Sequence, residues 1–430
     1  MPRFQLIPVI LLGIATSAVA NDIDDAPIRY STTKPNNAVS QLQQQLDAGR
    51  EPLKFVDDHG YLPSVLKALN VPVSSQVLVF SKTSFQRERI GPKTPRAIYF
   101  NDETYVGFCL RGDVLEFSAT DPQLGTVFYS LEQESDQTPR FRRHTENCLI
   151  CHGSSRTQGF PGHLVRSVTT DRLGMPILSS GSKQTDHSSP ISERWGGWYV
   201  TGTHGKQQDH MGNWIVQNSR NPQAEENVAG QNVTELKSRF TVGNYLSPHS
   251  DIVALMVLEH QIEGHNRITR ANMLTRQALY QETELNRELK EPVGKRWEST
   301  TRRIRAAGEP LVEYLLFSEE AKLTDPVKGT SAFTEEFAKR GPFDRSGRSV
   351  REFDLKTRLF RYPCSYLIYT PAFDAMPTEV RDYVLRRMWD VLSGADASPK
   401  FAHLSATDRR NVREILRETK PKLPDYWKRD

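Results

Sequence analysis

Five short runs rich in β-branched and aromatic residues follow one another between residues 75 and 131. They read SQVLVFS, RAIYFN, TYVGFCL, VLEFSA and GTVFYSL, and turn residues such as Asn101 and Asp102 separate them. Runs of this length bounded by turn signals are typical of strands joined by short connections. The pattern predicts an antiparallel meander from about Gln76 to Leu131.

Two segments with helical periodicity precede these runs. Val39, Leu42 and Leu46 recur at helical spacing, and Pro63 opens a second short pattern that ends near Leu69. We expect two short helices that cover one side of the sheet.

From Asp251 onward the pattern is helical. The stretch 251–291 lacks proline until its end and carries apolar residues at Ile252, Leu255, Met256, Ile262 and Ile268. Two further helices are predicted to begin at Thr378 and at Ser405, the second with Asp408 in a capping-box position. The C-terminal part is therefore expected to be mostly α.

The residues between these zones, 132–250, follow neither period. They contain scattered glycine and proline and six histidines, namely His144, His152, His163, His187, His204 and His210. Loops of this length without periodicity are usually functional. A bound cofactor would explain how this segment becomes ordered.

The N-terminus reads MPRFQLIPVILLGIATSAVA, in which Arg3 precedes an apolar run and Ala18 and Ala20 complete a small-x-small pattern. This is typical of a secretory signal peptide, cleaved near Asn21. The apolar run is shorter than the roughly 20 residues that span a bilayer, and no later segment is long and apolar enough. We expect a periplasmic or otherwise exported protein without a stable membrane span.

Charge narrows the class of partner. The chain has 56 Lys and Arg against 52 Asp and Glu, a formal charge of +4 that falls to +3 when Arg3 leaves with the signal peptide. This balance predicts no nucleic-acid partner.

The clearest chemical signal is ENCLICHGSS, which places Cys148, Cys151 and His152 within about one helical turn. Cys-x-x-Cys-His is the attachment signature of c-type haem. A thioredoxin-like pair would sit in a βαβ unit, whereas the strands here form a meander. Zinc would need a further ligand such as His144 or His163. A plain disulfide also stays open, and we favour haem.

CLICH resembles the haem-attachment motif of c-type cytochromes, and the whole chain resembles large secreted proteins with a single such motif. The resemblance implies one haem c, covalently attached to Cys148 and Cys151, with His152 as the proximal iron ligand. In small class I cytochromes c the motif lies near the N-terminus, whereas long segments flank it here. A minimal cytochrome fold is therefore not expected.

The sixth iron ligand decides what such a haem does. Met175, in RLGMPI, resembles the context of the distal methionine of small cytochromes c, and His204, His210, Met211 and His163 are alternatives. Thioether ligation raises the potential and suits electron transfer, and two imidazoles lower it. An empty position permits chemistry with peroxide, oxygen or small gases.

Other residues near the motif invite weaker hypotheses. Arg140, Arg142 and Arg143, followed by His144, would hold the haem propionates or present a basic rim to an acidic redox partner, unless they are solvated surface charge. The aromatic residues of WGGWYV, 195–200, line a haem crevice or pack in the core.

Two more pairs of residues lie outside the motif region. His260 and His265 lie about 140° apart on a helix, so they do not chelate one ion together, and a packed His260 is favoured. Cys109 and Cys364 are predicted to form a disulfide in an oxidising space.

Together these patterns predict an α+β protein with an N-terminal antiparallel β-meander, an irregular haem-binding segment and a mostly α C-terminal region. The predicted parts are a signal peptide at 1–20, a β-rich domain at 21–135, a c-type haem-binding segment at 136–250 and a helical domain at 251–430. The favoured function is electron transfer. A haem enzyme of the oxidoreductase class with an open distal site near His204 and His210, or a haem-based sensor, is the alternative.

Overall fold

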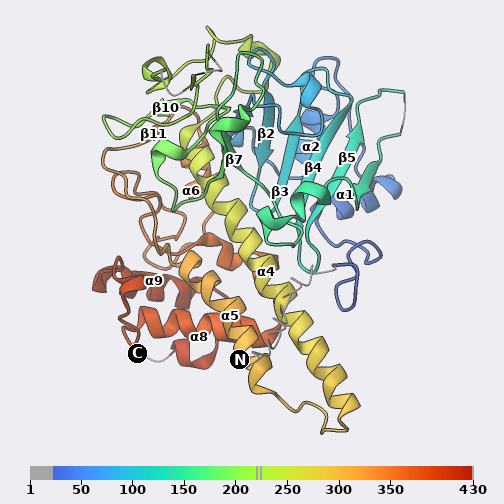
Figure 1. Ribbon diagram of the computed structural model, residues 1–430, viewed down its shortest axis with the longest axis vertical. Coiled ribbons are helices and arrows are strands. Elements are labelled where there is room, and N and C mark those ends of the chain that lie inside the picture. Colours follow the sequence, from blue (N-terminus) through green and yellow to red (C-terminus); the bar gives the residue numbers. More distant parts are fainter. Residues whose placement is uncertain (1–22, 137, 219–220, 223–224, 429–430) are drawn as a thin grey trace, which may run out of the picture.

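The computed structural model describes residues 23–136, 138–218, 221–222 and 225–428. The predicted signal peptide lies outside the described residues. An N-terminal antiparallel sheet is followed by a mostly helical C-terminal region, so the α+β prediction is confirmed (Figure 1).

The sheet has seven strands in the order β6-β5-β4-β3-β2-β1-β9. They are β1 (Val77–Val79), β2 (Arg96–Phe100), β3 (Thr104–Phe108), β4 (Val114–Asp121), β5 (Gly125–Glu132), β6 (Phe141–His144) and β9 (Trp198–Tyr199). Each of the five predicted runs forms a strand. The sheet continues past Leu131, because β6 and β9 add to its two edges. Smaller two-stranded pairs are β7 (Arg166–Val168) with β8 (Ser182–Gln184), and β10 (Gly202–Thr203) with β11 (Lys328–Gly329).

One face of the sheet is apolar and covered by two helices. Leu115, Phe117 and Ala119 of β4 pack in one hydrophobic cluster with residues of α1 (Ala38–Asp47) and α2 (Leu62–Ala68). This confirms the two predicted N-terminal helices and their place on the sheet.

The opposite face carries a row of aligned residues that are less uniformly apolar. Tyr105 pairs with Ser118, Ser118 with Phe128, and Phe128 with His144 across four neighbouring strands. Because side chains alternate between the faces of a strand, these four point to the same side. This face forms one wall of the site described below.

Helix α4 (Ile252–Glu288) joins the two halves of the molecule and runs diagonally through it (Figure 1). The Asp251 side chain caps its N-terminus by accepting hydrogen bonds from the backbone N–H of Val253 and Ala254. Most residues in its first half are buried. The predicted long helix is confirmed.

The C-terminal region packs against α4. It comprises α5 (Glu298–Leu315), α6 (Phe333–Ala338), α7 (Pro371–Asp374), α8 (Thr378–Leu392) and α9 (Ala406–Thr419), which Ser405 and Asp408 start with a capping box. The helices predicted at Thr378 and Ser405 are confirmed. Helix α5 was not predicted, because Pro310 and Gly308 lie inside it. A Cβ on Gly308 would lie 2.6 Å from the Tyr383 ring, so glycine permits the close approach of α5 and α8.

The predicted disulfide between Cys109 and Cys364 is wrong. Both are free, buried thiols in different surroundings. Cys109 follows β3 near Arg96 and Glu116, whereas Cys364 belongs to the core of the C-terminal helices. Burial raises the pKa of each thiol to about 12.

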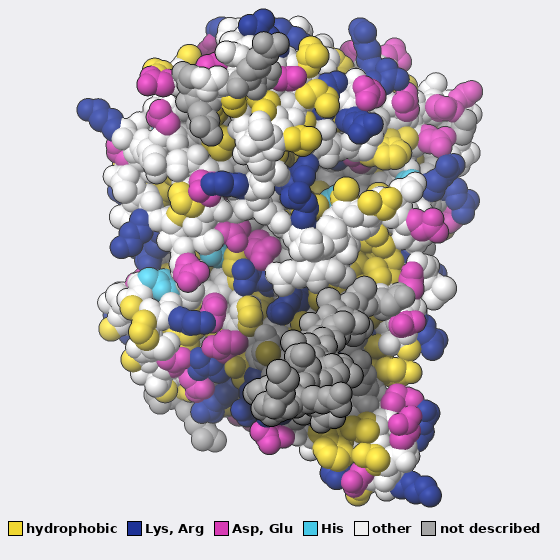
Figure 2. Space-filling view, viewed as in Figure 1, with side chains coloured by type: hydrophobic (Ala, Val, Ile, Leu, Met, Phe, Trp, Pro, Cys, Tyr) yellow, Lys and Arg dark blue, Asp and Glu magenta, His cyan; other side chains and the backbone are white. Residues whose placement is uncertain are grey.

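The described surface carries both signs of charge. On the face shown in Figure 2, Lys and Arg side chains are interspersed with Asp and Glu. Within the described part of the chain, no helix combines the length and the apolar character needed to cross a membrane.

Candidate functional site

A cavity of about 550 Å³ lies against the second face of the sheet, and Cys148, Cys151 and His152 all line it. Strands β2 to β5 form one wall, and Leu258 and Ile262 of α4 contribute to another. The volume falls within the usual range for small-molecule sites.

The Cys-x-x-Cys-His motif forms a single helical turn, as its spacing predicts. Helix α3 (Leu149–His152) begins directly after Cys148 and ends at Gly153. Cys151 is exposed, Cys148 is half-buried, and both are free thiols. Burial raises the pKa of the Cys148 thiol to about 11, with smaller contributions from Glu116 and Cys151. The turn therefore presents two thiols and one imidazole to the same cavity.

The His152 imidazole is held in one tautomer. Its Nδ1 lies 2.9 Å from the carbonyl oxygen of Gly162, which can only accept, so Nδ1 carries the proton. The Gly162 N–H donates back to the His152 carbonyl at 2.8 Å. Burial lowers the pKa of His152, which keeps the ring neutral near pH 7. Nε2 is then a lone-pair donor available to a metal.

A side chain of α4 fixes the backbone segment that holds this imidazole. Asn266 accepts a hydrogen bond from the His163 N–H at 2.9 Å and donates one to the His163 carbonyl at 3.0 Å. A Cβ on the neighbouring Gly162 would lie 2.6 Å from Asn266 Oδ1, so glycine is required for this approach. Asn266 of α4 thus positions His152 indirectly, through the backbone of His163 and Gly162.

The cavity walls combine apolar rings with one buried ion pair. Val79, Phe128 and Trp198 supply apolar surface, and the Phe128 ring centroid lies 4.7 Å from that of His152. Arg96 and Glu116 form a 2.5 Å ion pair that is mostly buried. Glu116 also accepts hydrogen bonds from the Ser84 hydroxyl and the Gln86 amide, which satisfy its carboxylate.

Of the five residues predicted as candidate sixth iron ligands, His163 lines the cavity and the other four lie elsewhere. Met175 is 48% exposed on a turn, with its backbone N–H bound to Asp171. His204 and His210 are buried with ring centroids 4.9 Å apart, and Met211 accepts a hydrogen bond from a serine hydroxyl. None of these four is among the described residues that line the cavity.

Two other histidines do line it. His163 is buried, with Nδ1 and Nε2 each 3.2 Å from the hydroxyls of Ser118 and Thr120. His144 Nε2 lies 2.8 Å from the Ser130 hydroxyl. Both rings already have hydroxyl partners on the sheet.

The histidines of α4 are packed, as predicted for His260. Its ring is fully buried and its Nδ1 lies 2.7 Å from Nδ1 of His187. His265 Nε2 donates to the carbonyl of Asp102 at 2.7 Å. Neither helix residue lines the cavity.

The arginines before the motif are engaged outside the cavity or exposed. Arg142 pairs with Glu132 at 3.3 Å, Arg143 donates to two backbone carbonyls near the N-terminus, and Arg140 is exposed. The cavity is instead lined by Arg156 and Arg166. Sequence reasoning missed both, although Arg156 lies only four residues after His152. Of the aromatic run, Trp198 lines the cavity, whereas Trp195 packs against His210.

No family model, no curated protein and no solved structure matches this chain. Across the described ranges, no three His, Cys, Asp or Glu side chains group as a metal site. Of the three histidines that line the cavity, His144 and His163 are bonded to hydroxyls of the sheet, which leaves the His152 imidazole and two thiols. This set fits a metal that brings its own macrocycle better than it fits a bare zinc ion.

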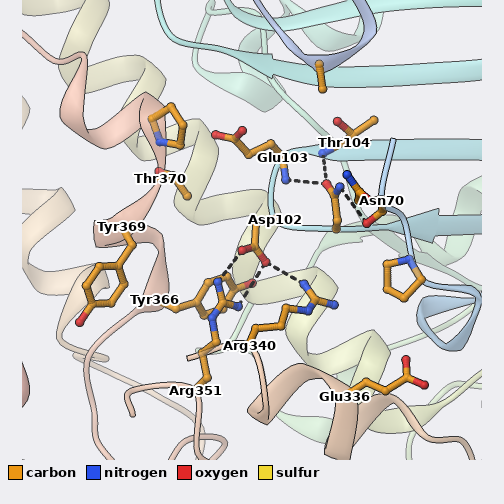
Figure 3. A pocket seen from close by; sticks show the side chains of 14 residues that line it. Asn70, Asp102, Glu103, Thr104, Glu336, Arg340, Arg351, Tyr366, Tyr369 and Thr370 are labelled. Atoms are coloured by element: carbon orange, nitrogen blue, oxygen red, sulfur yellow. Dashed lines mark hydrogen bonds and ion pairs between the residues drawn. The ribbon is translucent and has the colours of Figure 1, made fainter. Parts of the chain in front are cut away.

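A second cavity, of about 420 Å³, lies where the β2–β3 turn meets the C-terminal region (Figure 3). Asp102 accepts hydrogen bonds from Arg340 at 3.0 Å and from Arg351 at 3.2 Å. Both arginines are therefore engaged by the same carboxylate.

Proposed function

We propose that this protein is an exported c-type haem protein that transfers electrons. Cys148 and Cys151 would attach one haem c through thioethers, and His152 would be its proximal ligand. The observation that carries the proposal is the His152 hydrogen bond to Gly162 through Nδ1, in a residue that lines the same cavity as both thiols. Metal-ligating histidines almost always donate their other ring N–H in this way.

The alternatives to haem fit the cavity less well. A thioredoxin-like cysteine has a lowered pKa, whereas burial raises that of Cys148. Structural zinc takes four protein ligands, and the two further histidines of the cavity are bonded to hydroxyls. When bound, haem would supply a one-electron iron couple, and apolar walls such as Phe128 and Trp198 would exclude water from it.

Electron transfer is favoured because the attachment turn lies at the surface. Ile150 is 76% exposed and Phe85 is 70% exposed, and both line the cavity. A ring attached at the exposed Cys151 would have an edge within reach of a docked protein. We expect that redox partner to present an acidic face, because Arg140 and Arg142 are exposed beside the motif.

A haem enzyme or sensor with an open distal site is the second candidate. It is favoured by one observation, which is that Met175, His204 and His210 lie away from the cavity. The ferric spectrum separates the two functions. A low-spin, six-coordinate form that ignores cyanide supports a carrier, whereas a high-spin form that binds cyanide quickly supports the enzyme or sensor.

The test of haem attachment uses the full chain, exported by a host that matures c-type cytochromes. We expect a pyridine haemochrome spectrum of one haem per chain, retained after acid-acetone extraction. The variant Cys148→Ala/Cys151→Ala should lose it, and the matched control Cys109→Ala/Cys364→Ala should keep it. Haem that is extracted from the wild-type protein would overturn the proposal.

A further inference from the structure

We propose that Arg156 and Arg166 form a two-cation site for carboxylates on the cavity wall, and that in the haem-loaded protein this site takes the two haem propionates. This inference rests on the proposed function. It assigns a role to residues that the sequence pattern did not single out.

The first observation is that these two guanidinium groups have no partner. Arg96, the third arginine of the cavity, is paired with Glu116. Arg142 is paired with an acid, and Arg143 with backbone carbonyls. By contrast, no described residue forms an ion pair or a side-chain hydrogen bond with Arg156 or Arg166, although both line the cavity.

The second observation is that both backbones are fixed close to the attachment turn. Arg166 lies on β7, opposite Gln184 of β8, and its carbonyl accepts a hydrogen bond from the Trp198 indole at 2.8 Å. Arg156 lies in the 3₁₀ turn Ser155–Thr157, whose Thr157 hydroxyl donates to the His152 carbonyl at 3.0 Å. The backbone positions from which the two arginines extend are therefore fixed relative to His152.

The third observation is electrostatic. Burial, followed by the charge of the neighbouring Arg156, lowers the pKa of the Arg166 guanidinium. Two like charges beside an apolar cavity without a counter-ion repel each other, and a ligand with two carboxylates relieves that repulsion. Guanidinium groups match carboxylates in shape and bind them through paired hydrogen bonds. Haem carries two such carboxylates, one for each arginine.

The test compares Arg156→Gln/Arg166→Gln with Arg142→Gln, which removes an exposed arginine outside the cavity. Haem content should stay at one per chain in both, because the thioethers hold the ring. The double variant should lower the midpoint potential, since removing positive charge near the iron disfavours the ferrous form. A tenfold change in the preference for ferrous over ferric iron corresponds to about 59 mV.

A potential that stays at the wild-type value in a fully loaded double variant would overturn the inference. Because Arg156 is exposed, Arg156→Gln should fold normally and must lower the potential by itself if the double variant does not fold. The single variant Arg166→Lys keeps the positive charge, so its midpoint potential should stay close to that of the wild type. If the wild-type protein carries no haem, the proposed function fails first, and the two failures are distinguishable.

A free carboxylate is the other source of the same chemistry. The haem-free variant Cys148→Ala/Cys151→Ala, titrated with succinate by calorimetry, should bind it only weakly. Tight, arginine-dependent binding of succinate, with no change of potential in the loaded double variant, would overturn the assignment to propionates. Weak binding together with a lowered potential would support it.

Discussion

Helix α4 borders two histidine-containing regions that differ in what their imidazoles face. On the cavity side, His152 is bonded through Nδ1 and lines an open volume together with two thiols. On the other side, His187 and His260 are fully buried, stack on Tyr314 and Phe317 and share a hydrogen bond. Histidine count alone therefore does not identify ligands. His152 is the proposed ligand because its Nδ1 is bonded to Gly162 and it lines the cavity.

The closed region is also built around a buried ion pair. Arg194 and Glu259 lie 3.3 Å apart with side chains that are 3% and 0% exposed. Thr185 donates to Glu259, and Arg194 donates to the His187 carbonyl. Burial raises the pKa of Glu259 to about 7. The polar groups here are bonded to one another, whereas the cavity also contains Arg156 and Arg166, which have no ion-pair partner among the described residues.

The largest expected effect is the loss of stability in acid. Burial lowers the pKa of His187 and His260 far below 6.5 and that of His210 to about 3. Below pH 6.5 the unfolded chain binds more protons than the folded one, so each such histidine lowers stability by about 1.4 kcal/mol per pH unit. For His210 this continues down to about pH 3.

Three buried carboxyl groups oppose this trend over part of the range. Burial raises the pKa of Glu103, Glu259 and Glu320 to about 7, so the folded state binds more protons at these groups between about pH 4.5 and 7. The histidines outnumber them, because burial also lowers the pKa of His163 and His265. Urea unfolding at a series of pH values should show stability that falls below pH 6.5 and falls more steeply below 4.5. His210→Gln should make the slope shallower, and an unchanged slope would contradict the assignment of His210 as a buried neutral ring.

The next effect is the removal of one partner of the buried ion pair. Arg194→Ala should destabilise the protein by about 3 kcal/mol, because Glu259 is left buried without its counter-charge. The haem spectrum should not change, since neither residue lines the cavity. Arg142→Ala, at an exposed pair, should stay within about 0.5 kcal/mol of the wild type. Chemical denaturation of the wild type and the two variants measures the free energy of unfolding. A shifted haem spectrum in Arg194→Ala would contradict the separation of the ion pair from the cavity.

Two asparagines of α4 bond to the backbone in different places, one beside the cavity and one away from it. Asn266 clamps the backbone next to Gly162, whereas Asn272 donates to the Pro122 carbonyl away from the cavity. Replacing either with alanine should cost about 1 kcal/mol. Only Asn266→Ala should also raise the midpoint potential, because a looser His152–Gly162 hydrogen bond makes the imidazole a weaker electron donor. Redox titration measures the midpoint potentials. Equal midpoint potentials in the two variants would contradict a positioning role of Asn266.

Local signals were enough for part of the fold. The strands from β1 to β5 have strong β-rich runs, and the Ser405 capping box and the Asp251 cap are short-range hydrogen-bond patterns. The edge strands β6 and β9 have too few apolar residues to produce such a pattern. Helix α5 was not predicted because it contains Pro310. Elements whose sequence pattern lies within about one turn of chain were predicted. Elements that depend on distant neighbours were not.

The same limit applies to the site. The motif at 148–152 is local and its single turn was predicted. The partners of His152 come from later in the chain, since Gly162 supplies the carbonyl and Asn266 of α4 holds the backbone of the next residue, His163. Arg143 is close to the motif in sequence, yet its guanidinium donates to the carbonyls of Tyr30 and Thr33. Arg166 lines the cavity because β7 brings it there.

The smallest effect is expected at Met175, which the sequence favoured as the sixth ligand. Its side chain is 48% exposed, and Asp171 holds only the backbone of the turn. Met175→Leu should therefore change stability by less than about 0.5 kcal/mol. It should also leave the potential and the ferric spectrum as they are, including any near-infrared sulfur-to-iron band. Loss of such a band in Met175→Leu would mean that the turn carrying Met175 moves to the cavity when haem is attached. In that event the cavity would be open only in the haem-free protein, and the result would support the electron carrier rather than the enzyme.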